Sequence, residues 1–198
     1  MKRNIRTIKI SVLTALIVFA IGCSEYSAPT ASQPTDTPTE NFQYPPVEDV
    51  IATVEAAGYH LVNPVAQSSL DNCASVSTTR LCRTNNVTNL HLSGIVKLRV
   101  PGSVLPNNMD ITIVAPSACV GVADFYPHPT VFNGDVEITW DLDLMVLPEG
   151  AAYSDILPLY VHDDGTVEEV SFTLQNNNKL IVTTNHFSRY ILTSRVSF

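Results

Sequence analysis

A period-two alternation of apolar and polar side chains runs through the second half of the chain and constrains its fold most. Val96, Leu98 and Val100 alternate with two basic residues, and the segment 136–143 places an apolar residue at every second position. Successive side chains of a β-strand point to opposite faces, so this alternation indicates strands that bury one face. Segments of similar character lie at 111–113, 156–161, 167–174, 179–184 and 187–193.

Turn residues separate these segments. Asn133-Gly134 and Asp163-Asp164-Gly165 are two examples, and such pairs between alternating runs favour hairpin turns. Short strands at this spacing predict an all-β fold, a two-sheet antiparallel β-sandwich, over residues 90–198. A segment of this length is long enough to bury one core.

Residues 47–89 lack this alternation. Val47, Val50, Ile51 and Val54 have helical spacing, and Gly58 follows where a helix commonly stops. We therefore expect one short N-terminal helix over 47–57, packed on the edge of the domain. Residues 61–89 are polar and weakly patterned, so we expect mostly loop there.

The first residues have the pattern of a secretory signal. Lys2, Arg3, Arg6 and Lys9 precede an apolar stretch over 10–21, and small residues follow it. This stretch is shorter than the about 20 residues that a membrane-spanning helix needs. We therefore expect a signal peptide over 1–22.

The end of that segment, Ala20-Ile21-Gly22-Cys23, resembles the lipobox of bacterial lipoproteins. The resemblance implies cleavage before Cys23 and acylation of Cys23 by fatty acids such as palmitate. The protein would then be attached to the membrane through this lipid, since at least two acyl chains give stable anchoring. Ser24 resembles the outer-membrane sorting signal of that family. Residues 23–46 are rich in Ser, Thr and Pro and are expected to form an extended tether.

The charge of the chain argues against a nucleic-acid partner. The whole chain has 11 basic and 19 acidic residues, a net charge of −8. Removing residues 1–22, which hold four of the basic residues, leaves a net charge of −12. Nucleic-acid binding needs clustered Lys and Arg. An acidic domain suits solubility, and it is also able to meet cationic partners or divalent ions.

Three cysteines remain after Cys23. An oxidising envelope favours a disulfide, and Cys73 with Cys82 would close a short polar loop, which is the pairing we expect. The other pairings stay open. Cys119 lies in an apolar run, where a small buried thiol is the ordinary interpretation. Their spacing does not resemble a structural zinc site.

Several segments together resemble the ZU-five domain, which zonula occludens proteins, netrin receptors, ankyrins and bacterial envelope proteins share. They are 100–106 with 111–113, 124–128 with 132–136, and 157–165 with 186–190. One departure is that Pro101 is followed directly by Gly102, where the family usually has an intervening residue. The resemblance implies a β-sandwich interaction module, and a few members of the family cut their own chain.

His186-Phe187-Ser188 resembles the self-cleavage motif of those members. The Ser188 hydroxyl would attack the Phe187 carbonyl, His186 would accept the hydroxyl proton, and water would hydrolyse the resulting ester. The alternative is structural: His186 at a strand end, Phe187 in the core and Ser188 bonded to an edge group. Large apolar residues of both parities follow Phe187, which predicts either a strand buried on both faces or a bulge near Ser188.

Acidic residues suggest two further alternatives. Asp141 and Asp143 share a strand face, and four more acids lie near a later hairpin: Asp163, Asp164, Glu168 and Glu169. Clustered oxygen ligands would suit calcium. Glu137 with Asp141 and Asp143 could also suggest a carboxylate hydrolase, although outward acids are ordinary on a solvated strand face. We expect no cofactor and no metal.

The leading interpretation is a membrane-anchored envelope lipoprotein that presents a non-enzymatic interaction or structural module to an unknown protein or envelope partner. Self-processing between Phe187 and Ser188, and a calcium- or ligand-binding sandwich, are the alternatives.

Overall fold

The computed structural model describes residues 42–65 and 73–195. The expected signal peptide over 1–22, the lipidation site Cys23 and the tether as far as residue 41 lie outside the described residues. Within the described residues, no helix is long and apolar enough to cross a membrane.

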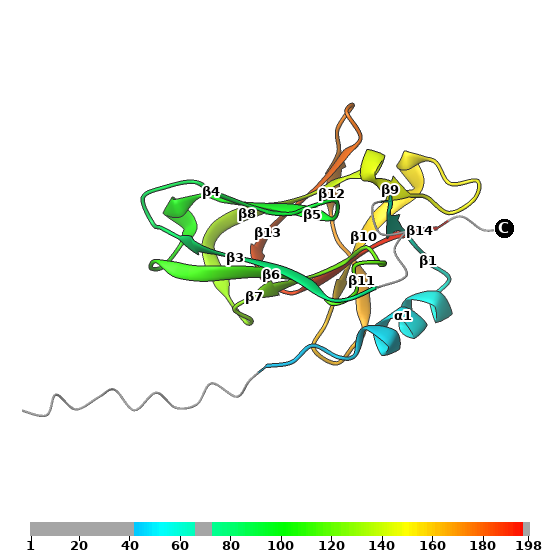
Figure 1. Cartoon of the computed structure of the whole chain (residues 1–198), viewed down its shortest axis with the longest axis horizontal. Helices are drawn as coiled ribbons and strands as arrows, with labels where there is room; N and C mark the ends of the chain where they lie inside the picture. The colour runs from blue at the N-terminus through cyan, green and yellow to red at the C-terminus, as the bar shows by residue number, and fades with distance from the viewer. Residues whose placement is uncertain (1–41, 66–72, 196–198) are drawn as a thin grey trace, which may run out of the picture. The chain divides into compact units, whose positions relative to one another are not determined.

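The described strands form the two-sheet antiparallel sandwich that the alternation predicts (Figure 1). The seven-stranded sheet has the order β11 (Val167–Glu169), β10 (Ile156–Val161), β14 (Arg189–Ser194), β7 (Val122–Tyr126), β6 (Met109–Ala115) and β3 (Val76–Cys82), and β1 (His60–Leu61) also pairs with β14. The five-stranded sheet has the order β12 (Phe172–Leu174), β13 (Lys179–His186), β8 (Val131–Asp141), β5 (Val96–Val100) and β4 (Thr88–Leu92). A short pair, β2 (Asn63–Pro64) and β9 (Met145–Val146), completes the fold.

Apolar side chains from both sheets fill one core. The inward residues of β5 and β8 are those that the alternation predicts, and Leu98 and Trp140 are 1% and 0% exposed. The outward residues Lys97 and Arg99 remain exposed. Burying one large apolar side chain contributes about 1.5–3 kcal/mol, so the alternating pattern itself fixes which face of each strand turns inward.

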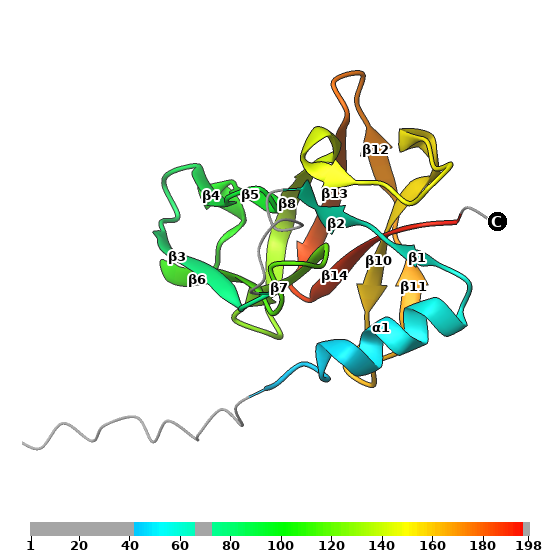
Figure 2. The same cartoon turned by 45° about the vertical axis from the view of Figure 1, so that its right-hand side comes forward.

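The predicted helix is confirmed as α1 (Val47–Ala56). The helix ends just before Gly58, which has a φ of 84° that favours glycine. Val50 and Val54 are fully buried and pack in a cluster that includes Val161 and Ile191. Figure 2 shows α1 crossing the ends of β10 and β11. The helix thereby covers part of the outer face of the seven-stranded sheet.

This helix explains the two-sided apolar pattern of β14. All residues of β14 are buried, because the sandwich core covers one face and the α1 cluster covers part of the other. A register shift also occurs between Thr184 and His186 of β13. The shift lies in β13, and β14 pairs with β10 in unbroken register, so the strand buried on both faces is the cause that explains the pattern.

Three sequence expectations about the strands are wrong. Residues 61–89 are not mostly loop, because β3 pairs with β6 along its whole length and belongs to the sandwich. The segment 167–174 is not one strand, because β11 and β12 lie in different sheets. Asn133-Gly134 is not a turn but lies within β8. A Cβ on Gly134 would come within 3.1 Å of the Val104 side chain, so close packing explains this glycine.

The predicted tether also ends earlier than expected. Residues 42–46, which we call the strap, pack on the sandwich and do not continue the tether to residue 46. Tyr44 is 4% exposed and its hydroxyl donates to the Phe125 carbonyl at 3.2 Å. The Arg189 guanidinium lies over the Tyr44 ring at 5.0 Å and donates to the Pro45 carbonyl at 2.6 Å. The Tyr44 side chain of the strap and the Arg189 guanidinium of β14 thus stabilise the strap on β7 and β14.

The direct Pro101-Gly102 step has a steric reason. Gly102 begins a 3-10 turn over Gly102–Val104. A Cβ there would lie 2.4 Å from the Arg83 carbonyl oxygen and 2.5 Å from that of Asn86. Both are backbone atoms that cannot move aside easily, so only glycine fits at this position.

Candidate functional site

His186-Phe187-Ser188 lies where the chain passes from β13 of the five-stranded sheet to β14 of the seven-stranded sheet. Phe187 is 1% exposed, and its ring packs in the core against Phe125 and Phe132, with centroids 5.7 and 4.7 Å away. The Phe187 N–H donates to the Thr130 carbonyl at 3.1 Å. The central residue of the motif therefore helps to close the core between the sheets.

The two chemical groups of the motif have different partners. The Ser188 hydroxyl is fully buried and donates to the Val161 carbonyl at 2.9 Å, which ties β14 to β10. The His186 ring contacts Asn185 and Thr184 through Nδ1, each at 3.2 Å. Among the described contacts, the structure does not bring the His186 ring to the Ser188 hydroxyl.

A second histidine contacts the Phe187 carbonyl. Nδ1 of His128 lies 2.7 Å from this oxygen, and Nε2 lies 3.0 Å from the Asp163 carboxylate. Both partners are acceptors, so the doubly protonated ring satisfies both. The Phe42 ring of the strap packs on His128 at 4.1 Å. His128 thus connects the strap, the Phe187 backbone and the 163–165 turn.

A pocket opens beside His186 at the edge where the two sheets are joined by the link from β11 to β12. We call it the open-edge pocket, and its volume is about 260 Å³. The link residues Val170 and Ser171 form part of its lining. The polar and aromatic residues that line it come from β8, β10, β11, β13 and β14, and include Asp135, Tyr160, Glu168, Thr184, His186 and Tyr190.

Burial keeps His186 neutral near neutral pH. Desolvation lowers the pKa of the His186 ring below its ordinary value, the charge of His128 lowers it further, and Glu168 opposes both effects. The Asn185 Oδ1 atom only accepts, so Nδ1 of His186 carries the proton. Nε2 then keeps its lone pair, and it makes no hydrogen bond to any described residue.

We expect the His186 ring to titrate below about pH 6.5, the ordinary histidine value. The neutral tautomer should carry its proton on Nδ1. Because the unfolded chain then binds the proton at higher pH than the folded chain, stability should fall as pH drops below that value. Nitrogen-15 NMR of the ring across the acid range measures both properties, with His186→Asn identifying the signal. Titration above the ordinary value would contradict this assignment.

Tyr190 also lines the open-edge pocket and is held there by a hydrogen bond. The Tyr190 hydroxyl donates to Thr184 Oγ1 at 3.2 Å. The Thr184 hydroxyl in turn donates to the His186 carbonyl at 3.3 Å. Burial raises the pKa of Tyr190 to about 12, so this phenol stays a hydrogen-bond donor. The Tyr160 ring packs on Tyr190 at 5.8 Å and on His186 at 5.2 Å, which gives the pocket aromatic walls.

The acids considered for calcium are dispersed among separate partners. Asp141 pairs with Lys179, Asp143 accepts from Tyr153 and Asn178, Asp163 faces His128, Asp164 accepts from Thr166, Glu168 faces His162, and Glu169 faces Arg195 and Tyr59. Glu137 of the hydrolase alternative pairs with Arg99 at 3.3 Å. Over residues 42–65 and 73–195, no group of three or more His, Cys, Asp or Glu side chains is placed to hold a metal ion.

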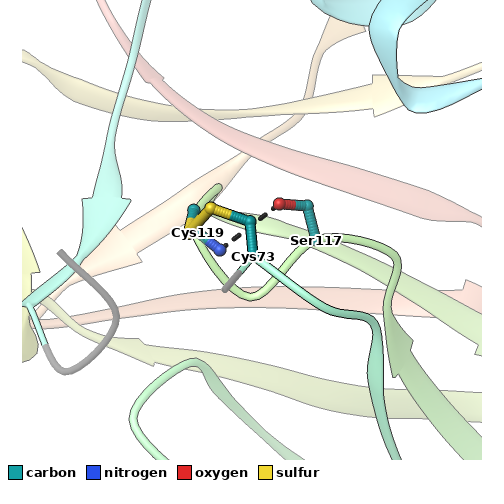
Figure 3. Close-up of a disulfide and its surroundings, with 3 residues drawn as sticks. All are labelled: Cys73, Ser117 and Cys119. Atoms are coloured by element: carbon teal, nitrogen blue, oxygen red, sulfur yellow. Dashed lines mark hydrogen bonds between the residues drawn. A yellow bond between two sulfur atoms is a disulfide. The ribbon is translucent and has the colours of Figure 1, made fainter. Parts of the chain in front are cut away.

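The expected Cys73–Cys82 disulfide is wrong. Figure 3 shows Cys73 bonded to Cys119, while Cys82 is a buried free thiol. Cys82 lies at the far end of β3, and a strand of this length spans about 20 Å. Antiparallel pairing of β3 with β6 instead brings the segment before Val76 to the segment after Ala115. The Ala118 N–H donates to the Ala74 carbonyl at 3.2 Å beside the bond.

No protein-family model matches the sequence, and no curated protein matches it. The likeness to the ZU-five family therefore stays a prediction that rests on the sequence segments named above.

Proposed function

We propose that the chain is a bacterial envelope lipoprotein that holds a non-enzymatic interaction module of ZU-five type at the outer membrane through lipid on Cys23. The observation that carries this proposal is Ala20-Ile21-Gly22-Cys23 at the end of a basic and then apolar segment. Ser24 follows the cysteine, as in lipoproteins that are sorted to the outer membrane. The strong acidity of the remaining chain favours a protein or envelope partner over a nucleic acid.

Two features of the described domain support an envelope location and an anchored module. Disulfides persist in oxidising compartments, and Cys73 and Cys119 form one here. The strap is packed on β7 and β14 through Tyr44 and Arg189, so the tether joins the sandwich at a fixed point.

The described polar groups support binding more than catalysis. Ser188 and Tyr190 donate to protein groups within the fold, and most of the acids considered above are paired. The open-edge pocket offers a ligand group space, the exposed Asp135 and the Nε2 atom of His186, which makes no hydrogen bond to a described residue. We therefore propose recognition of a partner as the activity of the sandwich.

Lipidation is tested by comparing the wild-type chain with Cys23→Ala in a Gram-negative host. The wild type should incorporate an alkyne-labelled palmitate, fractionate with the outer membrane and have the mass of a chain that begins at acylated Cys23. Cys23→Ala should lose the label and the membrane association. Cys82→Ala, which removes a thiol inside the core, is the matched control and should keep both. A Cys23→Ala chain that stays labelled would reject the proposal.

Self-processing between Phe187 and Ser188 is the second candidate. The contact that favours it is the His128 ring on the Phe187 carbonyl, since a donor at that oxygen would stabilise negative charge during attack. The bond of the Ser188 hydroxyl to the Val161 carbonyl disfavours it, because the attacking oxygen is engaged elsewhere.

We expect the wild-type chain to stay intact between Phe187 and Ser188. Mass spectrometry under denaturing conditions should show one species, because cleavage would release residues 188–198 as a separate peptide. Ser188→Ala should show the same pattern, with a lower stability from the loss of the hydrogen bond to Val161. A wild-type chain that yields a fragment starting at Ser188, together with an intact Ser188→Ala chain, would establish self-processing instead.

A further inference from the structure

We propose that the open-edge pocket binds the ammonium or guanidinium group of a basic side chain that a protein partner presents. This inference rests on the proposed function, because it names the partner chemistry of the interaction module. It commits to a side chain of a protein, whereas a free amine in solution is an outcome that the experiment distinguishes.

The size of the pocket fits one side chain. Its volume is about 260 Å³. Pockets for drug-sized ligands have volumes of about 300–1,000 Å³. The head group and part of the stem of a lysine or arginine occupy a smaller space than such ligands do.

The charged groups that line the pocket are both carboxylates. Glu168 and Asp135 contribute carboxylates, and His186 contributes the lone pair of Nε2 because its Nδ1 proton is used by Asn185. None of the described lining residues is a lysine or arginine. Lysine and arginine heads are donors only, so they complement such a lining, whereas an anion would find no cation there.

The two carboxylates are available to a ligand. Asp135 is exposed and forms no ion pair within the described part of the chain. Glu168 faces His162 at 3.4 Å, but their side chains are 60% and 42% exposed, and such exposed pairs are weak. The described residues offer no group of three metal ligands, so we assign an organic cation to the pocket and not a metal ion.

Aromatic and apolar surfaces suit the rest of such a side chain. Tyr160 is half-buried beside His186 and presents a ring to the pocket, which favours a cation near its face. Phe172 of the edge strand β12 is 38% exposed and pairs with Val182, a lining residue. Paired residues of adjacent strands share a face, so Phe172 borders the pocket. The methylene stem of a basic residue can pack on it.

The experiment titrates the full-length lipidated protein in detergent micelles with N-acetyl-argininamide, N-acetyl-lysinamide and N-acetyl-glutaminamide, the last as the neutral control. We also include putrescine as a free diamine. NMR shifts of the His186 ring and of the backbone of β13 report occupancy. One basic amide should shift these signals at concentrations where the neutral amide does not. If putrescine shifts these signals at a lower concentration than the other three probes do, the site binds free amines and the protein-partner proposal is overturned.

Variants then test the acceptors. Glu168→Gln with Asp135→Asn should weaken binding of the basic amide by about tenfold or more, as expected for the loss of charged partners. Glu149→Gln removes an exposed acid outside the pocket and should leave binding unchanged. Equal binding by the double variant, or equal shifts with all four probes, would overturn the assignment. The wild-type titration decides even if the double variant is unstable.

The outcomes separate this inference from the function on which it rests. Correct lipidation at Cys23 without any cation binding would reject the pocket assignment alone. Cation binding without lipidation would reject the membrane anchoring and leave the pocket in place.

Discussion

Arg189→Ala is expected to lower the free energy of unfolding by about 3–5 kcal/mol, the usual cost of leaving a buried charge without its partner. Arg189 and Asp124 are each 4% exposed at the side chain. Nε donates to one carboxylate oxygen at 2.6 Å and Nη2 to the other at 2.8 Å. Without the guanidinium, the Asp124 carboxylate and the Pro45 carbonyl would lose donors inside the fold. Burial already raises the pKa of Asp124, and the guanidinium opposes this shift.

Denaturant unfolding followed by the fluorescence of Trp140, the only tryptophan, measures this effect. Arg99→Ala is the matched control, because Arg99 and Glu137 form an ion pair with side chains 47% and 42% exposed. That loss should be about 1 kcal/mol or less. The combination of Arg189→Met with Asp124→Leu should recover part of the stability, since no charge is then left buried. Equal losses for Arg189→Ala and Arg99→Ala would contradict the buried-pair argument.

The same substitution should also release the strap. Arg189 holds the Pro45 carbonyl and lies over the Tyr44 ring, so both contacts disappear together. The packing of the strap and the stability of β14 therefore both depend on the Arg189 side chain. We therefore expect the strap to stay packed on the sandwich as long as the domain is folded.

Strands with one buried face could be predicted from the sequence, and the others could not. In β4, β5 and β8 inward residues alternate with outward ones, so the pattern is visible. Most of β3 is exposed because it is an edge strand, so its sequence is polar and resembles a loop. Four of the five residues of β7 are buried, and an apolar run without alternation is ambiguous. The split of 167–174 between two sheets could not be predicted, because β11 and β12 have three residues each and are mostly exposed, so neither carries a clear burial pattern.

The candidate site shows the same limit. His186 was identifiable from its motif, but the open-edge pocket depends on strands β8, β10, β11, β13 and β14 meeting in space. The buried pair did leave a signal that sequence reasoning missed. Asp124 and Arg189 each interrupt an apolar run with a charge of opposite sign, and an isolated charge in a buried strand needs a partner. The disulfide required the pairing of β3 with β6, which no local pattern indicates.

Removing the disulfide through Cys73→Ser with Cys119→Ser is expected to lower the free energy of unfolding by about 4 kcal/mol according to the loop-entropy relation. The two cysteines are 46 residues apart in sequence, so the bond closes a long loop in the unfolded chain. The loop closed by the pairing first expected, Cys73 with Cys82, is much shorter and would stabilise less. The size of the loss therefore reports which cysteines are joined.

Cys82→Ala is the matched control for the disulfide variant. Cys82 is buried without a disulfide partner, so the substitution removes only one core sulfur and should cost far less than the double serine variant. Burial raises the pKa of the Cys82 thiol, so this residue should react with iodoacetamide only after unfolding. Peptide mapping without reduction should recover Cys73 joined to Cys119. A peptide joining Cys73 to Cys82, or a loss for Cys82→Ala as large as that of the double variant, would contradict the pairing, because both variants would break a bond between Cys73 and Cys82.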